Sequence, residues 1–372
     1  MMRTMRVVPL LACLALFTAS ASAQEAVSLG SRFGCGLTEE GTVRCWGRCD
    51  DGQCGSEGGN ARTPRPVPGL DDVTQIDVGF GFGCALRDDG TVWCWGDNGW
   101  LQLGVEGVEE RTEPAPVPGL TEVAEIALGG FHGCARRQNG QVLCWGNNGH
   151  GELGAPASVD KRAEPRVVPR VGRATELWSG QYNACAENRR GQIRCWGDSS
   201  YVQSGTRRRD RRARPTRLRF RGEVASMSIA SNHGCLVTTE GELRCWGSNV
   251  YGAHGGTEPI YDTPQRIEEL SDVRAFSTRS ENMCAVSEGR VHCWGVNRQH
   301  HLFVPTEEMG QVVIHPSAVP GLSDATDVSV GWSAQCARRE SGGWVCWGRN
   351  ADGAVGVGSL EAMVETPTPL PW

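Results

Sequence analysis

Cysteine is the residue type with the clearest chemical potential in this chain, which has 17 cysteines among 372 residues. Fourteen of them form seven pairs, separated by nine residues or, in one pair, by eight. Such pairs could form disulfides or bind zinc, but structural zinc sites prefer a closer Cys-x2-Cys spacing, which does not occur here. The sequence predicts disulfides between Cys35 and Cys45, Cys84 and Cys94, Cys134 and Cys144, Cys185 and Cys195, Cys235 and Cys245, Cys284 and Cys293, and Cys336 and Cys346, with a local bridge between Cys49 and Cys54.

The spacing of each pair fits opposite positions on a β-hairpin. A three-residue turn that ends at Gly90 would place Cys84 opposite Cys94. The sixth unit has one residue fewer, and a two-residue turn there still places Cys284 opposite Cys293. Backbones approach closely at such non-hydrogen-bonded positions, so a cross-strand disulfide fits there.

An arginine-dense segment, Arg207–Arg221, is the second candidate for chemistry. It contains nine arginines and one aspartate, whereas the whole chain has a net charge of −6. Guanidinium groups bind phosphate and carboxylate through paired hydrogen bonds, so the segment could hold an anionic glycan or an acidic protein surface. The alternative is a solvated loop without a ligand. The candidate contact residues in it are Arg207, Arg208, Arg209, Arg211 and Arg212.

Three aromatic residues in equivalent loops, Trp100, Tyr201 and Tyr251, are further contact candidates. Exposed aromatic side chains anchor many protein and sugar interfaces. Single exposed aromatics are also common without a function. The seven tryptophans that directly follow a cysteine are instead expected in the core between repeats.

Residues that could catalyse a reaction or bind a metal do not form a known motif. The chain lacks Gly-x-Ser-x-Gly, His-Glu-x-x-His and a phosphate-binding loop. His300, His301 and His315 could suggest a metal, but no carboxylate or cysteine stands at a ligand-like spacing from them. We therefore expect no enzyme activity, no cofactor and no metal, although a site gathered from separate repeats would not be visible in the sequence.

These residues recur within a unit of about 50 residues that must position them. The triplet Cys-Trp-Gly occurs seven times at intervals of 48 to 53 residues, which indicates a repeat architecture. One unit, residues 63–104, contains four short apolar segments separated by turn residues, as in a propeller blade. The 50 glycines also favour many turns over helices. The sequence predicts an all-β, seven-bladed β-propeller with about four strands per blade, formed by residues 24–372 as one domain.

The two ends of the chain predict how the ring closes. The first unit has no proline-bounded segment before Val27–Gly30, whereas the last residues, Thr366–Trp372, align with Thr63–Gly69. We therefore expect the C-terminal strand to complete the first blade. Such closure would remove an open sheet edge.

Residues 1–23 are typical of a secretory signal peptide. A basic start with Arg3 and Arg6 precedes the apolar run Val7–Phe17, and Ala21–Ala23 offers a cleavage site. The alternative is a lipoprotein box that ends at Cys13. The apolar run is too short to cross a bilayer, so no transmembrane helix is expected. Export to the periplasm, the cell surface or the medium agrees with an even number of remaining cysteines.

The repeat resembles that of the regulator of chromosome condensation family. The matching residues are Phe82–Leu86, Asp89–Asn98 and Gly151–Gly154, and the resemblance extends over nearly all of residues 24–372. It implies a seven-bladed propeller. The family's best-known activities, guanine nucleotide exchange on a small GTPase and chromatin binding, are not carried over, because export and disulfides would separate this chain from both partners.

The chain looks more like exported, cysteine-rich bacterial propellers of this repeat type, one group of which blocks β-lactamases through loops on one face. A fold provides a platform and does not name a ligand. The sequence therefore predicts a monomeric, non-enzymatic binding module for a protein or an anionic surface glycan. Its negative net charge argues against nucleic acid. The alternatives are a polysaccharide-acting enzyme with a site at the propeller mouth and an exchange-type regulator.

Overall fold

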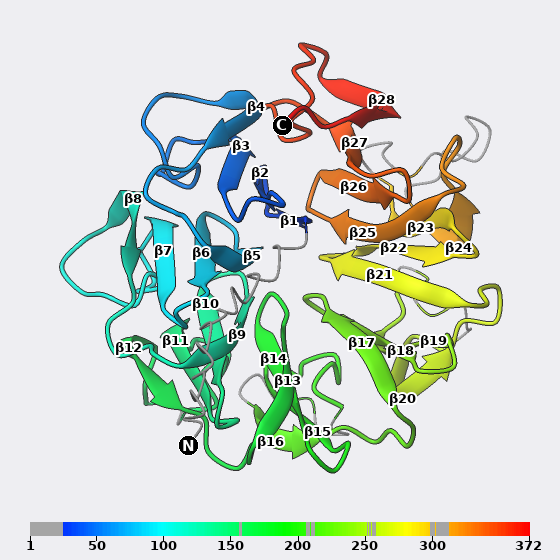
Figure 1. The fold of residues 1–372 in the computed structure, drawn as a ribbon. Helices are drawn as coiled ribbons and strands as arrows, with labels where there is room; N and C mark the ends of the chain where they lie inside the picture. Colours follow the sequence, from blue (N-terminus) through cyan, green and yellow to red (C-terminus); the bar gives the residue numbers. More distant parts are fainter. Residues whose placement is uncertain are drawn as a thin grey trace, which may run out of the picture.

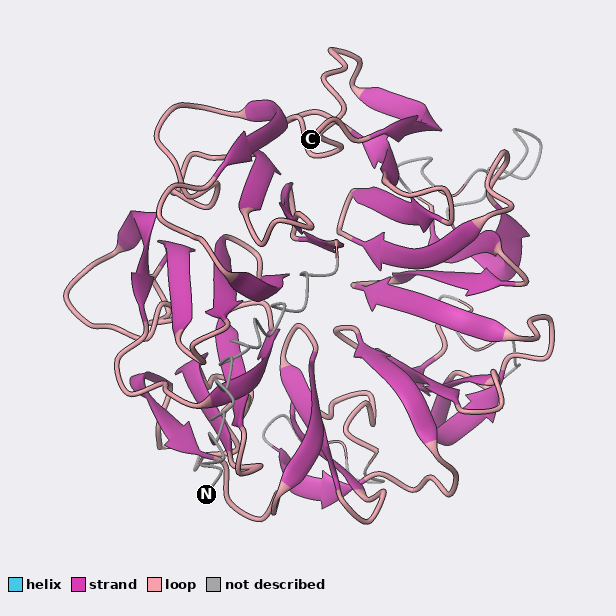
Figure 2. Ribbon diagram, viewed as in Figure 1, coloured by secondary structure: helices cyan, strands magenta, loops and turns pink. Residues whose placement is uncertain are grey.

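The computed structural model describes residues 25–155, 158–205, 209, 213–250, 252, 254, 258–297, 302 and 312–372. In this part of the chain, 28 strands form seven four-stranded antiparallel sheets around a central axis (Figure 1). The described elements are strands, turns and loops, without a helix (Figure 2). The predicted all-β, seven-bladed propeller is confirmed. The expected signal peptide, residues 1–23, and the alternative lipidated Cys13 lie outside the described residues.

Each blade consists of four strands that follow one another in sequence, from the innermost strand beside the axis to the outermost strand. Blade 1 contains β1 (Ala26–Leu29), β2 (Phe33–Leu37), β3 (Val43–Gly47) and β4 (Ala61–Pro66). Blade 2 contains β5 (Val73–Val78), β6 (Phe82–Arg87), β7 (Val92–Asp97) and β8 (Glu110–Pro116). Blade 3 contains β9 (Val123–Leu128), β10 (His132–Arg137), β11 (Val142–Asn147) and β12 (Lys161–Val167).

The remaining four blades have the same order. Blade 4 contains β13 (Ala174–Ser179), β14 (Asn183–Asn188), β15 (Ile193–Gly197) and β16 (Ala213–Arg217). Blade 5 contains β17 (Val224–Ile229), β18 (His233–Thr238), β19 (Leu243–Ser248) and β20 (Ile260–Arg266). Blade 6 contains β21 (Val273–Arg279), β22 (Asn282–Ser287), β23 (Arg290–Val296) and β24 (Val312–Ala318). Blade 7 contains β25 (Ala325–Val330), β26 (Ala334–Arg339), β27 (Trp344–Arg349) and β28 (Met363–Pro369).

The predicted closure of the first blade by the C-terminal strand is wrong. Strand β28 pairs with β27, where Thr368 lies opposite Cys346, and blade 1 has its own outer strand, β4. Each proline-bounded segment is the last strand of its own blade and not the first strand of the next. The loop after the third strand returns the chain to its own hairpin, which closes a shorter loop than a strand supplied from the far end of the chain.

Blades 7 and 1 instead meet side by side. The Trp372 ring packs edge-on against Trp46 with 6.2 Å between the ring centroids. The Trp46 Nε1–H donates to the Ala354 carbonyl of blade 7 at 3.1 Å. Ring closure therefore depends on side-chain packing and loop contacts between two complete blades.

The central hairpin of each blade carries a disulfide where the spacing predicted it. The described residues contain eight disulfides, and in the seven hairpin bridges the two Cα atoms are 4.0 to 4.1 Å apart. In the sixth blade the two-residue turn of Glu288 and Gly289 keeps Cys284 opposite Cys293. Cys49 and Cys54 form the additional loop bridge. This density of disulfides is typical of an oxidising environment.

The tryptophan after the second cysteine of each hairpin lies in the core between blades and is at most 1% exposed. In the first five blades its indole N–H donates to a loop carbonyl of the preceding blade, as in Trp145 to Gln102 at 2.8 Å and Trp196 to Glu152 at 2.7 Å. The glycine after it has a φ of +98 to +114°, which favours a residue without a side chain. The triplet thus joins one blade to the next, which explains why it recurs.

Candidate functional site

One face of the ring, here called the loop face, carries the turn between the first and second strands of each blade and the long loop between the third and fourth strands. A backbone bond joins these two segments in all seven blades, as from Arg48 N to Arg32 O at 2.9 Å. Backbone bonds also join the turns of blades 7 and 1, 2 and 3, and 3 and 4, as from Trp332 N to Gly30 O at 3.1 Å. At these three junctions the backbone of the loop face is therefore connected from blade to blade.

Four aromatic side chains form a continuous row on the loop face, here called the aromatic row. Their order is Trp100, Phe131, Phe80 and Trp332. Successive ring centroids are 6.3, 5.2 and 5.8 Å apart, and the last two pairs meet edge to face. Trp100 is 44% exposed and Trp332 is 42% exposed. The row brings together the consecutive blades 2 and 3 with blade 7, which is distant from them in sequence.

A pocket of about 390 Å³ lies between blades 7 and 1, next to the aromatic row; it is here called the arginine pocket. Its charged lining consists of three arginines, Arg32, Arg48 and Arg349, and one carboxylate, Asp352. Phe80 and Trp332 supply its aromatic wall. The lining of the arginine pocket thus has more arginines than carboxylates and adds an apolar aromatic surface.

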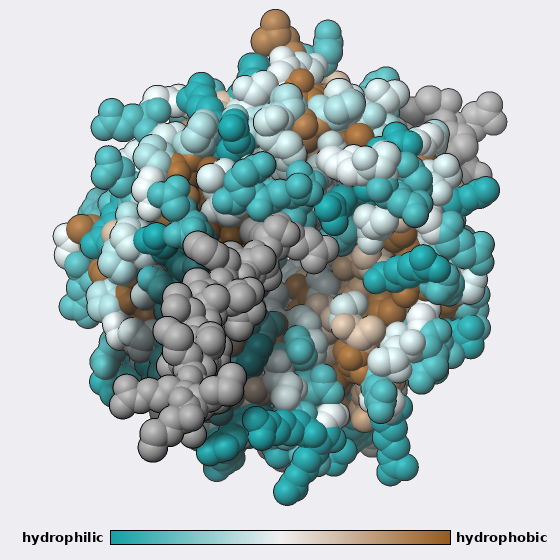
Figure 3. All heavy atoms as spheres, in the orientation of Figure 1, coloured by the Kyte–Doolittle hydropathy of each residue, from teal (hydrophilic) through white to brown (hydrophobic). Residues whose placement is uncertain are grey.

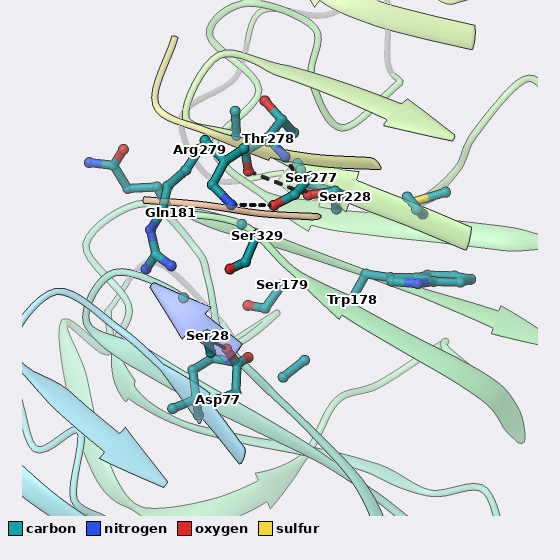
Figure 4. Close-up of a pocket in the computed structure, with 18 of the residues that line it drawn as sticks. Ser28, Asp77, Trp178, Ser179, Gln181, Ser228, Ser277, Thr278, Arg279 and Ser329 are labelled. Carbon is teal, nitrogen blue, oxygen red and sulfur yellow. Dashed lines mark hydrogen bonds between the residues drawn. The ribbon is translucent and has the colours of Figure 1, made fainter. Parts of the chain in front are cut away.

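A second cavity, of about 330 Å³, lies at the ring axis and is lined mainly by the innermost strands; it is here called the axial cavity. Figure 3 shows the hollow at the centre of the ring. Hydroxyl groups dominate the polar lining, and Figure 4 shows Ser179 and Ser329 pointing into the space, whereas the Trp178 ring points away. The charged groups in the lining are Asp77, Glu125 and Arg279.

Asp77 links three blades through its carboxylate. It accepts hydrogen bonds from Ser28 Oγ at 2.8 Å, from Leu128 N at 2.7 Å and from Val78 N at 2.8 Å. Burial raises the pKa of Asp77, while these bonds and the charge of Arg279 oppose that rise. The Asp77 carboxylate is thus a structural acceptor, because backbone amides occupy both of its oxygens.

Glu125 is held in a similar way. Its carboxylate pairs with Arg136 Nε at 2.7 Å and accepts from Leu177 N of the next blade at 3.2 Å. Burial raises the pKa of Glu125, and the bond to Arg136 lowers it. The two carboxylates in the axial cavity therefore bind neighbouring blades together and do not form an isolated acid–base pair.

Arg279 is exceptional for its position in the repeat. Arg279 stands two residues after the residue that lies opposite the first cysteine of the hairpin. At this position the other six blades have Gly30, Gly79, Gly129, Gly180, Ala230 and Gly331. The Arg279 guanidinium donates to the carbonyls of Leu29 and Val78 and lies 5.8 Å from the centroid of the Phe80 ring. It connects blade 6 with blades 1 and 2 and lies between the axial cavity and the aromatic row.

The structure places only part of the predicted contact set. Trp100 belongs to the aromatic row, and Tyr201, 45% exposed, lies on the loop face of blade 4. Arg209 is exposed. The remaining candidates lie outside the described residues: Arg207, Arg208, Arg211, Arg212 and Tyr251.

The arginine-dense segment is not one loop throughout. Residues 213–217 form β16, the outer strand of blade 4, and Arg219 beyond it pairs with Asp262 at 3.7 Å. His300 and His301 lie outside the described residues, and His315 pairs with Glu269. Among the described residues, no three His, Cys, Asp or Glu side chains gather as a metal site requires.

Sequence reasoning missed most of the loop-face residues that the ring brings together. Phe80, Phe131 and Trp332 occupy short turns after the innermost strands, where small or polar residues are usual. Bulky aromatics at these turn positions were the available signal. Arg32, Arg48 and Arg349 gave none, because no spacing in the sequence shows which loop side chains of blades 7 and 1 face one another.

Comparison with known proteins agrees with this architecture. A family model described as the RCC1-like domain matches residues 6–319. No protein with a curated description matches the chain. Prp20p from Saccharomyces cerevisiae is 21% identical, with 90% of this chain and 87% of that chain covered and a TM-score of 0.78.

Two further solved structures have the same fold. Human WBSCR16 is 21% identical, with 89% of this chain and 95% of that chain covered and a TM-score of 0.77. The CRINKLY WD40 ectodomain of the Arabidopsis thaliana receptor kinase ACR4 is 19% identical, with 94% and 98% covered and a TM-score of 0.55. The described part of the chain contains no helix that could cross a membrane.

Proposed function

Because this chain belongs to the RCC1-like domain family, we propose that it is an exported, non-enzymatic binding module that holds a protein partner on its loop face. RCC1-like propellers commonly mediate protein binding. The solved structure of Prp20p was described together with its binding properties to Gsp1p and histones, and a second structure contains Kap60 bound to the same yeast protein. These partners are those of the yeast protein.

The aromatic row is the observation that carries this proposal. Two half-exposed tryptophans joined by two phenylalanines provide a large apolar surface with few rotatable bonds, which is typical of interface hot spots. The bonds between neighbouring turns fix this surface before a partner binds, which lowers the entropic cost of association.

Eight disulfides support export, because such bonds persist in oxidising compartments. We therefore extend the proposal to residues 1–23 as a signal peptide that is removed. The ring would then meet its partner in the periplasm, at the cell surface or in the medium.

Binding is favoured over catalysis by the state of the axial carboxylates. A polysaccharide-acting enzyme needs a pair of carboxyl groups free to exchange protons with substrate. Asp77 and Glu125 instead accept bonds from backbone amides of neighbouring blades. The loop face, with its broad aromatic and arginine surface, is the better candidate for contact.

The test is a capture experiment with the oxidised protein, residues 24–372, and the culture supernatant and periplasm of its source. Wild type should retain a protein that the variant W100A/W332A loses, while V167A/I314A retains it. The control removes two exposed apolar side chains from outer strands, 51% and 53% exposed. Equal retention by all three proteins with equal melting temperatures would show that the loop face is not used.

A further inference from the structure

We propose that the arginine pocket binds a carboxylate side chain of an acidic peptide segment, whose neighbouring apolar side chain packs on Trp332 and Phe80. This inference rests on the proposed function and names the chemistry of the partner. Neither the arginines nor this pocket stood out in the sequence. The two halves of the pocket come from opposite ends of the chain and meet only because the ring closes.

The charges of the pocket favour an anion. Three arginines and one aspartate line it. Asp50 and Asp51, outside the lining, offset the charge of Arg48, so the positive charge open to a ligand is that of Arg349 and Arg32. Arg32 contacts Asp352 only at 3.6 Å and its side chain is 57% exposed, which leaves donors free. Arg349 is exposed, and no ion pair holds its guanidinium among the described residues. Arg48 is already paired with Asp50 at 3.0 Å and with Asp51, so Arg349 and Arg32 are the main donors to a ligand.

The pocket is built on a fixed backbone. Arg349 N donates to Ser333 O at 2.8 Å, and Arg48 N donates to Arg32 O at 2.9 Å. The Ser31 hydroxyl donates to the Phe80 carbonyl at 3.0 Å, which ties blade 1 to the aromatic row. The three guanidinium groups therefore start from anchored positions, and a ligand has to order only their side chains.

A carboxylate is the anion that fits this arrangement best. Guanidinium groups bind carboxylate oxygens through two parallel hydrogen bonds, and such charged bonds are stronger than neutral ones. A volume of about 390 Å³ admits one or two side chains and not a helix. The occupant is thus a short extended segment or a loop tip.

The aromatic wall favours a peptide over a glycan. Phe80 meets Trp332 at an interplanar angle of 68° and Phe131 at 85°, so ring edges and faces alternate along the row. Sugars stack on open aromatic faces, whereas apolar amino-acid side chains pack equally well against edges. A peptide also carries its carboxylate and its apolar group on adjacent residues, as the pocket and the row require.

The experiment uses a phage-displayed library of short random peptides selected on the oxidised protein. Selected peptides should be enriched in Asp or Glu next to an apolar residue. In fluorescence anisotropy, R32S/R48S/R349S should bind a selected peptide about 10- to 100-fold more weakly, as expected for lost charge-assisted bonds. The matched control R173S/R189S/R190S removes three exposed arginines from the opposite face and should bind as wild type does. Added salt should weaken binding to wild type and much less to the triple pocket variant.

The other outcomes separate the two proposals. Selected peptides could lack acidic residues and still bind wild type but not W332A. This result would overturn the proposed carboxylate pocket and support binding of a protein partner on the loop face. Failure to select any peptide that depends on Trp332 would count against both. A third outcome is that no acidic peptide is selected, while wild type binds a heparin oligosaccharide and the triple pocket variant does not. The ligand is then an anionic glycan, and the peptide proposal is wrong.

Discussion

The middle strands of each blade repeat the same key residues, whereas the strand beside the ring axis differs between blades. In the second and third strands every blade has the same disulfide and the same buried tryptophan. In the innermost strand, the residue opposite the first cysteine of the hairpin varies from blade to blade. These residues are Ser28, Asp77, Ala127, Trp178, Ser228, Ser277 and Ser329.

The difference follows from what each layer contacts. All seven core tryptophans are buried, and in the first five blades they bond to a loop carbonyl of the preceding blade, so equivalent surroundings favour the same residue. The axial residues face different neighbours and a cavity, so they can change without loss of blade packing. Arg279 is the extreme case, because it stands where the other blades have glycine or alanine. The residues that differ from blade to blade therefore lie mainly at the axis and on the loop face.

The largest predicted effect concerns the disulfides of the repeated layer. In the chain-entropy model each hairpin bridge contributes up to about 3 kcal/mol, and the total stability of a protein is about 5 to 15 kcal/mol. Protein unfolded with a reductant and then diluted into reducing buffer should stay unfolded, while oxidised protein should refold. Circular dichroism and thermal melting measure this.

The loop bridge is the control for that experiment. C49S/C54S removes a disulfide that occurs in blade 1 only, and it should refold in oxidising buffer with a small drop in melting temperature. A reduced chain with a native spectrum and melt would show that the hairpin bridges are dispensable.

The second prediction removes one core tryptophan. W145A should lower the free energy of unfolding by about 3 to 5 kcal/mol, because it leaves a large cavity and an unpaired Gln102 carbonyl. W196A should cost the same within about 1 kcal/mol, since its surroundings are equivalent. Urea unfolding measures both, and W100A on the surface is the control. A wide gap between the two core variants would contradict the equivalence of the blades.

The same contrast explains how far the sequence could predict the molecule. The repeat fixed the blade count, the hairpin register and the seven bridges, because each depends on residues close together in the chain. Ring closure was predicted wrongly, since the alignment of Thr366–Trp372 with Thr63–Gly69 was correct but did not say to which hairpin either segment pairs. The aromatic row and the arginine pocket were missed because Phe80 of blade 2 and Trp332 of blade 7 meet only once the ring is closed.

The third prediction concerns pH and a position where the blades differ. The first residue of the second strand is Phe33 in blade 1 and Phe82 in blade 2, but His132 in blade 3 and His233 in blade 5. Burial lowers the pKa of His132 from 6.5 to about 3. Between these values the unfolded chain binds a proton that the folded chain does not, so stability falls as pH drops below about 6.5.

The variant that isolates this effect is H132F, which places in blade 3 the residue found in blades 1 and 2. Each pH unit below the unfolded pKa costs about 1.4 kcal/mol per buried histidine. Wild type should thus lose about 2 to 3 kcal/mol more than H132F between about pH 6.5 and about pH 4.5. Burial also lowers the pKa of His233, to about 4, and this loss should remain in both proteins. Parallel pH profiles would show that His132 does not titrate on unfolding.

The smallest predicted effect is at the axis. The Ser277 hydroxyl accepts a hydrogen bond from Val330 N of blade 7 at 3.1 Å, as Ser28 does from Val78 N at 3.2 Å. S277A leaves that amide beside the axial cavity, where water can replace the hydroxyl, so the cost should be about 1 kcal/mol or less. Blade 3 already has a methyl group at this position, in Ala127. Urea unfolding of S277A and W145A under the same conditions measures the difference in the free energy of unfolding. If S277A loses as much stability as W145A, the axial residues are as constrained by packing as the hairpins. Weaker packing would then not explain why the axial residues differ between blades.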